Sequence, residues 1–173
     1  MILLVCGLSQ SGKSNLIERA QLEGLGIPSV KASTLLRTTG RPTVELDVID
    51  AIANQDYLAK QVLQATGSNA ELTILDGHLL IETIGGPQLV PDASLAPLPI
   101  VGVIFVQADS NVISKRREGS TFSRSIDEIT DLAQIELSQA RRFARKRGVL
   151  FEVVDAGDVK TFTQHITKFK PAN

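Results

Sequence analysis

The sequence predicts a three-layer α/β/α domain with a five-stranded parallel sheet. Short apolar runs alternate with longer amphipathic segments along the chain, a pattern typical of a parallel sheet that helices cover on both faces. A glycine-rich turn joins the first apolar run to the first amphipathic segment, as in a strand–loop–helix unit. The length of 173 residues suits one sizeable core, so we expect a single domain over residues 1–173.

The apolar runs are the predicted strands, and turn-forming or polar residues bound them. In chain order, the predicted strands cover residues 2–6, 28–31, 72–75, 100–106 and 149–154. The segments between and after them carry apolar residues at helical spacing. The predicted helices cover residues 13–25, 46–65, 111–117, 126–147 and 159–169.

The helix predicted over residues 126–147 has start and stop signals of its own. Ser125 and Glu128 form an S-x-x-E capping box before an apolar stripe, and Gly148 can supply the left-handed residue that ends the helix. Basic residues gather in its last turns, near the negative end of the helix dipole. They are Arg141, Arg142, Arg145, Lys146 and Arg147. We expect this basic end to be solvated rather than to bind nucleic acid.

Residues 85–99 contain four of the seven prolines and two adjacent glycines. Proline lacks a backbone donor, and both residue types favour turns. We therefore expect an irregular loop or an excursion between the third and fourth strands of the sheet.

The composition disfavours several function classes. The 18 basic and 19 acidic side chains give a net charge of −1, which provides no general attraction to nucleic acid or anionic lipid. An aromatic content of 4% offers few rings on which nucleic-acid bases could stack. No apolar run approaches the roughly 20 residues that cross a bilayer, so we expect no membrane partner. Cys6 lies in the first apolar run, where we expect a buried thiol in a reducing, cytoplasmic setting.

The turn after the first strand matches the Walker A pattern G-x-x-x-x-G-K-[ST] over residues 7–14. The backbone N–H groups of such a loop and the positive end of the following helix dipole form a cradle for anions. Lys13 would then reach the β- and γ-phosphates of ATP, and Ser14 would offer its hydroxyl to Mg²⁺. The candidate ATP-binding residues of this segment are Gly7, Ser9, Gln10, Ser11, Gly12, Lys13, Ser14 and Asn15.

Asp76 follows the third predicted strand and is the second candidate ligand of Mg²⁺. The carboxyl ends of parallel strands are where open α/β sheets bind ligands. An aspartate in this place is also a common turn residue, and the Walker A pattern is what favours the metal role.

Four further segments carry patterns of their own. They are residues 26–37, in which a Ser-Thr pair precedes Leu-Arg; Leu75-Asp76-Gly77-His78; the basic residues 115–117 followed by Arg124; and residues 154–159. Together with the Walker A turn, these segments resemble the nucleoside-monophosphate kinase family, and most of all its compact archaeal-type adenylate kinases. The resemblance extends over most of the chain.

The resemblance implies an acceptor site and a lid. Residues 33–66 would form the acceptor-binding part, and residues 115–125 a short lid. The residues implied around the acceptor are Ser33, Thr34, Arg37 and His78. The implied catalytic residues, which would neutralise charge on the transferred phosphoryl group, are Lys13, Arg116, Arg117 and Arg124. The residues implied to wrap the adenine base are Asp155, Gly157, Asp158 and Val159.

The sequence also departs from the family pattern. Bacterial-type relatives carry an arginine shortly after the Asp-Gly pair, whereas this chain has His78, Leu79 and Leu80 there. An aromatic platform for an acceptor base is not evident either. The acceptor need not therefore be AMP.

The function that we expect is in-line transfer of the γ-phosphoryl group of Mg-ATP to a nucleoside monophosphate. A small-molecule kinase on the same scaffold is the first alternative, and a hydroxyl acceptor would need a base such as Asp47, Asp50 or Glu82. The second alternative is a regulatory NTPase, against which Arg37 and the lid arginines argue. The sequence leaves the acceptor and the oligomeric state open.

Overall fold

A computed structural model describes residues 1–66 and 71–169, and these residues contain the predicted three-layer architecture. Within the described ranges, five parallel strands form one sheet in the order β2–β3–β1–β6–β7. The strands are β1 Ile2–Cys6, β2 Ser29–Lys31, β3 Thr73–Asp76, β6 Ile100–Gln107 and β7 Leu150–Asp155. They lie within two residues of the predicted bounds, and the fold class is confirmed.

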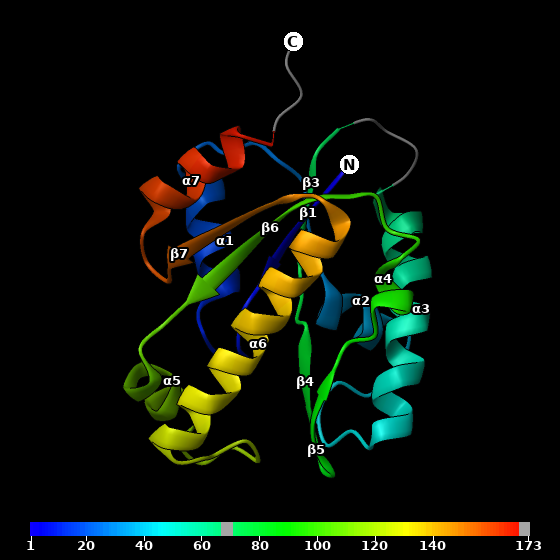
Figure 1. The fold of residues 1–173 in the computed structure, drawn as a ribbon, viewed down its shortest axis with the longest axis vertical. Coiled ribbons are helices and arrows are strands. Elements are labelled where there is room, and N and C mark those ends of the chain that lie inside the picture. Colours follow the sequence, from blue (N-terminus) through cyan, green and yellow to red (C-terminus); the bar gives the residue numbers. More distant parts are fainter. Residues whose placement is uncertain (67–70, 170–173) are drawn as a thin grey trace.

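Helices cover both faces of this sheet (Figure 1). The helices are α1 Lys13–Leu22, α2 Ala32–Thr38, α3 Val48–Thr66, α4 Asp92–Leu95, α5 Ser110–Arg117, α6 Ile126–Arg147 and α7 Val159–Thr167. Helix α1 ends before the predicted residue 25 because Gly24, at φ +91°, turns the chain, and its N–H donates to Gln21 O. Among the described helices, none is long and apolar enough to cross a membrane.

Strand β1 lies in the middle of the core and contributes to both faces of the sheet. Its alternate residues Ile2, Leu4 and Cys6 pack with residues of α3 and α6. Leu3 and Val5 point the other way and pack with residues of α1 and α7. All of these side chains are buried, which explains why the strand reads as a continuous apolar run. The burial of the Cys6 thiol also follows from this position.

Strand β6 is closely covered at Gly102. A Cβ atom there would lie 2.1 Å from the Phe169 ring, so the absence of a side chain lets the ring pack on the strand. Phe169 is itself buried in the core beside α1 and α7.

Residues 85–99 form an excursion from the sheet rather than an irregular loop. Strand β4, Leu80–Thr83, and strand β5, Gly86–Leu89, form an antiparallel hairpin that extends beyond the carboxyl edge of the main sheet (Figure 1). Gly86, at φ +107°, makes the tight turn, and Thr83 Oγ1 donates to Gly86 O over 2.7 Å. Pro87 is tolerated because a two-stranded hairpin leaves one side of each strand without ladder partners.

The capping signals of α6 are confirmed. The Ser125 side chain accepts from the Glu128 N–H, and the Glu128 carboxylate accepts from the Ser125 N–H. Gly148 takes the left-handed conformation at φ 65° and ends the helix.

The basic end of α6 is largely exposed, and it also contacts α4. Arg142 and Lys146 each lie 2.8 Å from an Asp92 carboxylate oxygen at the start of α4. Arg147 donates to Leu95 O over 2.6 Å and to Leu98 O over 3.1 Å. Arg142 and Lys146 remain exposed, as expected, whereas Arg147 is half-buried against the α4 segment, and the charges of all three tie this segment to α6.

Candidate functional site

The Walker A turn lies at the carboxyl edge of the sheet, between β1 and α1, and its glycines are sterically required. Gly7 has φ +144°, and a Cβ atom there would lie 2.3 Å from Val106 O of the neighbouring strand. Gly12 has φ +103°, and a Cβ atom there would lie 3.1 Å from Arg116 Nη1. The loop is therefore closely packed from two sides, and its backbone is free of side chains where a phosphate would approach.

Lys13 lies at the base of this loop and is only 4% exposed. Its ammonium group donates to Gly7 O over 2.6 Å and to Leu8 O over 3.2 Å. Burial lowers the pKa of Lys13 below its usual value, while the Glu136 and Asp76 carboxylates act in the opposite direction. The cation is thus held beside the loop by uncharged acceptors that an anionic phosphate could replace.

The side chains of Ser14 and Asp76 place two oxygen atoms that can bind a metal next to Lys13. Ser14 Oγ donates to Asp76 Oδ2 over 2.6 Å, although the two residues are 62 positions apart. The pairing of β3 with β1 brings them together. Hydroxyl and carboxylate oxygens suit Mg²⁺, which binds few protein groups and keeps several waters. Within the described ranges, no group of three or more His, Cys, Asp or Glu residues could hold a metal.

A cavity of about 700 Å³ opens beside the loop. The predicted site residues that line it are Ser9, Gln10, Gly12, Lys13, Ser14, Asn15, Ser33, Arg37, Asp76, His78 and Arg116. Residues of β1 to β4, of α2 to α4, of the segment 43–46 and Gly77 complete the lining. Most of the residues predicted for ATP, metal and acceptor thus share one cavity.

Sequence reasoning missed some polar residues of this lining. They are Lys31, Thr43, Asn54 and Gln55. Asn54 and Gln55 are buried on α3, where Asn54 Nδ2 donates to Pro42 O over 2.8 Å. Their signal is two adjacent amides within an amphipathic helix, which pattern reasoning assigns to the surface.

His78 contacts the Walker A turn at Gly7. Its Nδ1 is 2.9 Å from Gly7 O, and because a carbonyl only accepts, this nitrogen carries the proton. Glu136 Oε1, on α6, is 3.7 Å from the same nitrogen and accepts the Leu79 N–H over 3.0 Å.

Glu136 is fully buried near Lys13, and sequence reasoning missed it. Burial acts to raise the pKa of Glu136, but His78, Lys13 and the Leu79 N–H together lower it below its ordinary value. A carboxylate in this place adds negative charge under the cationic loop. Its sequence signal is a position on the apolar stripe of α6, four residues after Leu132.

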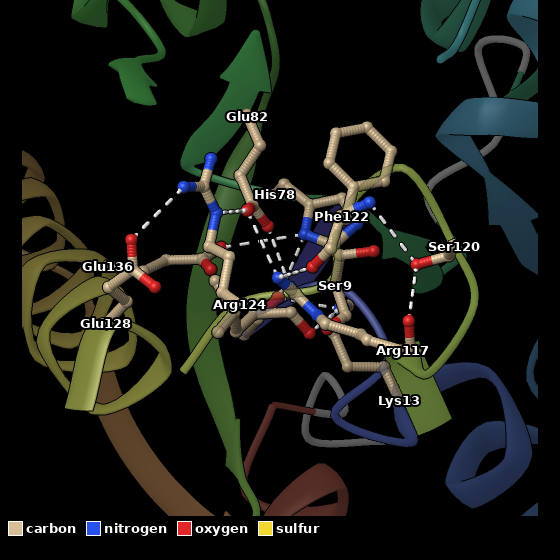
Figure 2. Close-up of polar contacts among 12 residues, drawn as sticks. Ser9, Lys13, His78, Glu82, Arg117, Ser120, Phe122, Arg124, Glu128 and Glu136 are labelled. Atoms are coloured by element: carbon tan, nitrogen blue, oxygen red, sulfur yellow. Dashed lines mark hydrogen bonds and ion pairs between the residues drawn. The ribbon is translucent and has the colours of Figure 1, made fainter. Parts of the chain in front are cut away.

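Two predicted lid arginines do not line the cavity. Arg117 is 1% exposed, and its guanidinium group pairs with the Glu82 carboxylate over 2.7 Å. Arg124 Nε lies 2.9 Å from the other Glu82 oxygen (Figure 2). The acceptor-site candidate Thr34 is exposed and accepts from Arg37 Nη2 over 3.4 Å.

The predicted adenine loop lies beside the Walker A turn. Ala156 Cβ is 3.4 Å from the position that a Cβ atom on Gly12 would take. Asp155 accepts from Gln107 Nε2 over 2.7 Å and lines a second cavity of about 280 Å³. Asp158 caps α7, and its bonds to Thr161 lower the pKa of the Asp158 carboxyl.

The other members of this loop are placed by the backbone. The Gly157 N–H donates to Asp155 O over 2.8 Å, and the Val159 side chain is buried in the core. The candidate bases Asp47, Asp50 and Glu82 lie outside the lining of the large cavity. Asp47 accepts the Asp50 N–H over 2.7 Å in the first turn of α3.

Solved structures of kinases share this fold. The shikimate kinase from Acinetobacter baumannii, in complex with shikimate, matches 96% of this chain over 90% of its own, with 14% identity and a TM-score of 0.61. A sugar kinase from Janibacter sp. HTCC2649 matches 97% of this chain over 92% of its own, with 16% identity and a TM-score of 0.56.

These likenesses show that the chain shares its fold with the two kinases. Neither protein is described as an adenylate kinase or another nucleoside-monophosphate kinase, so the narrower resemblance stays a prediction. No protein-family model matches the chain, and the search of curated proteins gave no match.

Proposed function

We propose that this chain is an ATP-dependent phosphotransferase that transfers the γ-phosphoryl group of Mg-ATP to a small acceptor. One observation carries the proposal: a single cavity is lined both by Lys13, Ser14 and Asp76, at and beside the Walker A turn, and by the cationic Arg37. Phosphoryl transfer asks a protein mainly to position two reactants and to neutralise charge. A cavity lined by both groups of residues can position the two reactants and neutralise their charge.

The residues of the loop would act on the triphosphate. Lys13 would exchange the Gly7 and Leu8 carbonyls for phosphate oxygens, and Arg116, which contacts the Walker A turn at Gln10, would add positive charge. Mg²⁺, held through Ser14 and Asp76, would supply further charge neutralisation. The bond between the γ-phosphorus and its bridging oxygen breaks, a bond to the acceptor oxygen forms, and ADP leaves.

A nucleoside monophosphate is the first candidate acceptor. In this proposal residues 33–66 bind the acceptor, with Ser33 and Arg37 at its phosphate, and residues 115–125 act as the lid. The loop of Asp155, Gly157, Asp158 and Val159 would contact the adenine of ATP, in keeping with the closeness of Ala156 to Gly12. The family resemblance and the cationic side chains of Lys31 and Arg37 in the lining support this acceptor.

A small metabolite with a hydroxyl group is the second candidate acceptor. The fold likeness to a shikimate kinase and a sugar kinase supports it. So does the lining, since the described residues around the cavity include the amides of Asn54 and Gln55 but no Phe, Tyr or Trp for stacking. A hydroxyl acceptor would release a proton, and His78, which lines the cavity, would accept it on Nε2, because Nδ1 already carries a proton.

Transfer of label from γ-³²P-ATP to a panel of acceptors tests the proposal. The panel holds the common nucleoside monophosphates, hexoses and hydroxy acids. We expect transfer of label to one class of acceptor to be faster than hydrolysis of ATP. We expect Arg37→Ala to raise the KM for that acceptor at least about tenfold, while the KM for ATP stays unchanged. Thr38→Ala, on the same helix outside the cavity lining, is the matched control. ATP hydrolysis far above transfer to every acceptor would instead favour a regulatory NTPase.

A further inference from the structure

The Glu82 carboxylate joins the β4–β5 hairpin to the segment 115–125. It lies on β4 of the hairpin, and two arginines of the segment 115–125 contact it. Arg117 binds both oxygens, with Nη2 2.7 Å from Oε1 and Nη1 3.1 Å from Oε2. Figure 2 shows the carboxylate between the Arg117 and Arg124 guanidinium groups. We call Glu82, Arg117 and Arg124 the Glu82 cluster.

The Glu82 cluster is in direct contact with the Walker A turn. Arg117 Nη2 also donates to Ser9 O over 2.9 Å. The adjacent Arg116 donates through Nη1 to Gln10 O, likewise over 2.9 Å. Two consecutive arginines at the end of α5 therefore hold two consecutive carbonyls of the turn, and Gln10 has the uncommon φ of 67° for a residue with a side chain.

The two arginines differ in what they can do next. Arg116 is exposed and lines the large cavity, so its remaining donors can face a ligand. Arg117 is buried and lies outside the lining, and its planar fork is occupied by Glu82 and Ser9 O. Arg117 could reach a phosphate only by leaving Glu82 buried with Arg124 as its remaining partner, which is costly for a carboxylate away from water.

We propose that Glu82 and Arg117 are positioning residues that hold the Ser9–Gln10 backbone, and through it Arg116, in the arrangement that receives a triphosphate. A bidentate pair fixes the Arg117 plane, and this plane fixes the Ser9 carbonyl. The Ser9 and Gln10 peptide groups then present their N–H sides to the anion without having to reorganise. The nature of the ligand rests on the proposed function, whereas the fixing of the loop does not.

Hydrogen exchange of the ligand-free protein tests the fixing of the loop. Two variants weaken the pair in different ways: Glu82→Gln removes the charge with little change of shape, and Arg117→Lys keeps the charge but offers a point donor that cannot serve Glu82 and Ser9 O in one plane. We expect exchange of the amides of residues 9–13 to become at least about tenfold faster in both variants, as for the loss of one charge-assisted hydrogen bond. Phe162→Leu, a core variant on α7, controls for a general loss of stability.

The outcomes separate this inference from the proposed function. Faster exchange confined to the loop and the hairpin, with weaker Mg-ATP binding by calorimetry in both variants, supports the positioning role. Unchanged exchange in the loop, or a rise that Phe162→Leu reproduces, overturns it. If the wild-type protein binds no Mg-ATP while the loop exchange still rises, the proposed function fails and the role of the pair in holding the loop stands.

Discussion

Lys13 combines burial with a positive charge, and both properties suit it to bind an anion. Its ammonium group lies between loop carbonyls and above the buried Glu136, and its pKa is lowered mainly by burial. A triphosphate brings the strong anionic partner that this cation lacks in the ligand-free protein. Lys13 should therefore contribute more to bound phosphate than to the stability of the fold.

Replacement of Lys13 tests whether the residue contributes more to phosphate binding than to the stability of the fold. We expect Lys13→Met to lower kcat at least about a hundredfold, because a donor aimed at the transferred group is lost while the apolar stem remains. The thermal midpoint should change little or rise, since a desolvated charge is removed. Steady-state kinetics and a circular dichroism melt measure the two effects. Lys160→Met, on the exposed face of α7, is the control, and equal loss of activity in both variants would contradict the role of Lys13.

Single residues were the scale at which sequence reasoning reached furthest and also failed most clearly. The Walker A pattern placed Lys13 and Ser14, because the chemistry and the local backbone are encoded in eight consecutive positions. Glu136 was beyond its reach, since a glutamate in a helix is read as exposed unless its neighbours in space are known. The different environments of Arg116 and Arg117 likewise depend on the Glu82 carboxylate, which is 35 residues from Arg117 in sequence.

Among the elements, α6 shows how local signals can fix both ends of a helix. Its capping box and its terminal glycine are both present as the sequence indicates. The cap satisfies backbone N–H groups of the first turn, which would otherwise lack partners.

Ser125→Ala should lower the free energy of unfolding by about 1 kcal/mol, as is typical for the loss of an N-cap side chain. Urea unfolding followed by circular dichroism gives this value. Ser138→Ala, within the same helix and exposed, should be neutral or slightly stabilising because alanine has the higher helix propensity. A loss at position 138 as large as that at position 125 would show that the cap is not the cause.

The contact of α4 with α6 should depend on pH. Hydrogen bonds from Arg142 and Lys146 lower the pKa of Asp92 below its ordinary value of 3.8. A depressed carboxyl pKa gives stability that is present above the ordinary value and is lost as the pH falls through the folded value. Asp92→Asn should therefore cost under about 1 kcal/mol near pH 7, and the difference from wild type should vanish at acidic pH. Urea titrations between pH 7 and pH 3 measure it, and a pH-independent difference would point to packing instead.

The β4–β5 hairpin is the element that sequence reasoning misread. Its prolines and glycines suggested an irregular loop, and the alternation in Leu80–Thr83 was too short to be recognised as a strand. The adjacent pair Gly85-Gly86 between two short runs is a hairpin signal that was available. The pairing itself became evident only from the tertiary structure, in which the hairpin bears Glu82.

For the whole molecule, binding of Mg-ATP should appear as stability. A ligand that binds only the folded state raises the free energy of unfolding by about 2.7 kcal/mol at a concentration 100 times its Kd. We expect a rise of this size with Mg-ATP in a thermal shift experiment, and a smaller one when EDTA removes the metal. Lys13→Met should lose most of the effect, and the absence of any shift in wild type would argue against the proposed function.

The arrangement of the strands was the part of the global fold that the sequence pattern could not supply. Apolar runs predicted where the strands lie, but periodicity carries no information on which strands pair. The order β2–β3–β1–β6–β7 places Asp76 on one side of β1 and Val106 on the other. The acceptor is undetermined for the same reason, because its site is assembled from segments that meet only after folding.

The carbonyl of Val106 that backs Gly7 has a consequence for how the protein is made. The phosphate cradle begins at the seventh residue, yet the strand that supports it on this side ends about a hundred residues later. Parallel strands so distant in sequence pair late, because a long loop must close first. During synthesis the Walker A segment therefore leaves the ribosome well before strand β6, which supports its folded form, has been made. Nucleotide in the cell should consequently favour the finished chain and offer no help to its earliest folding steps.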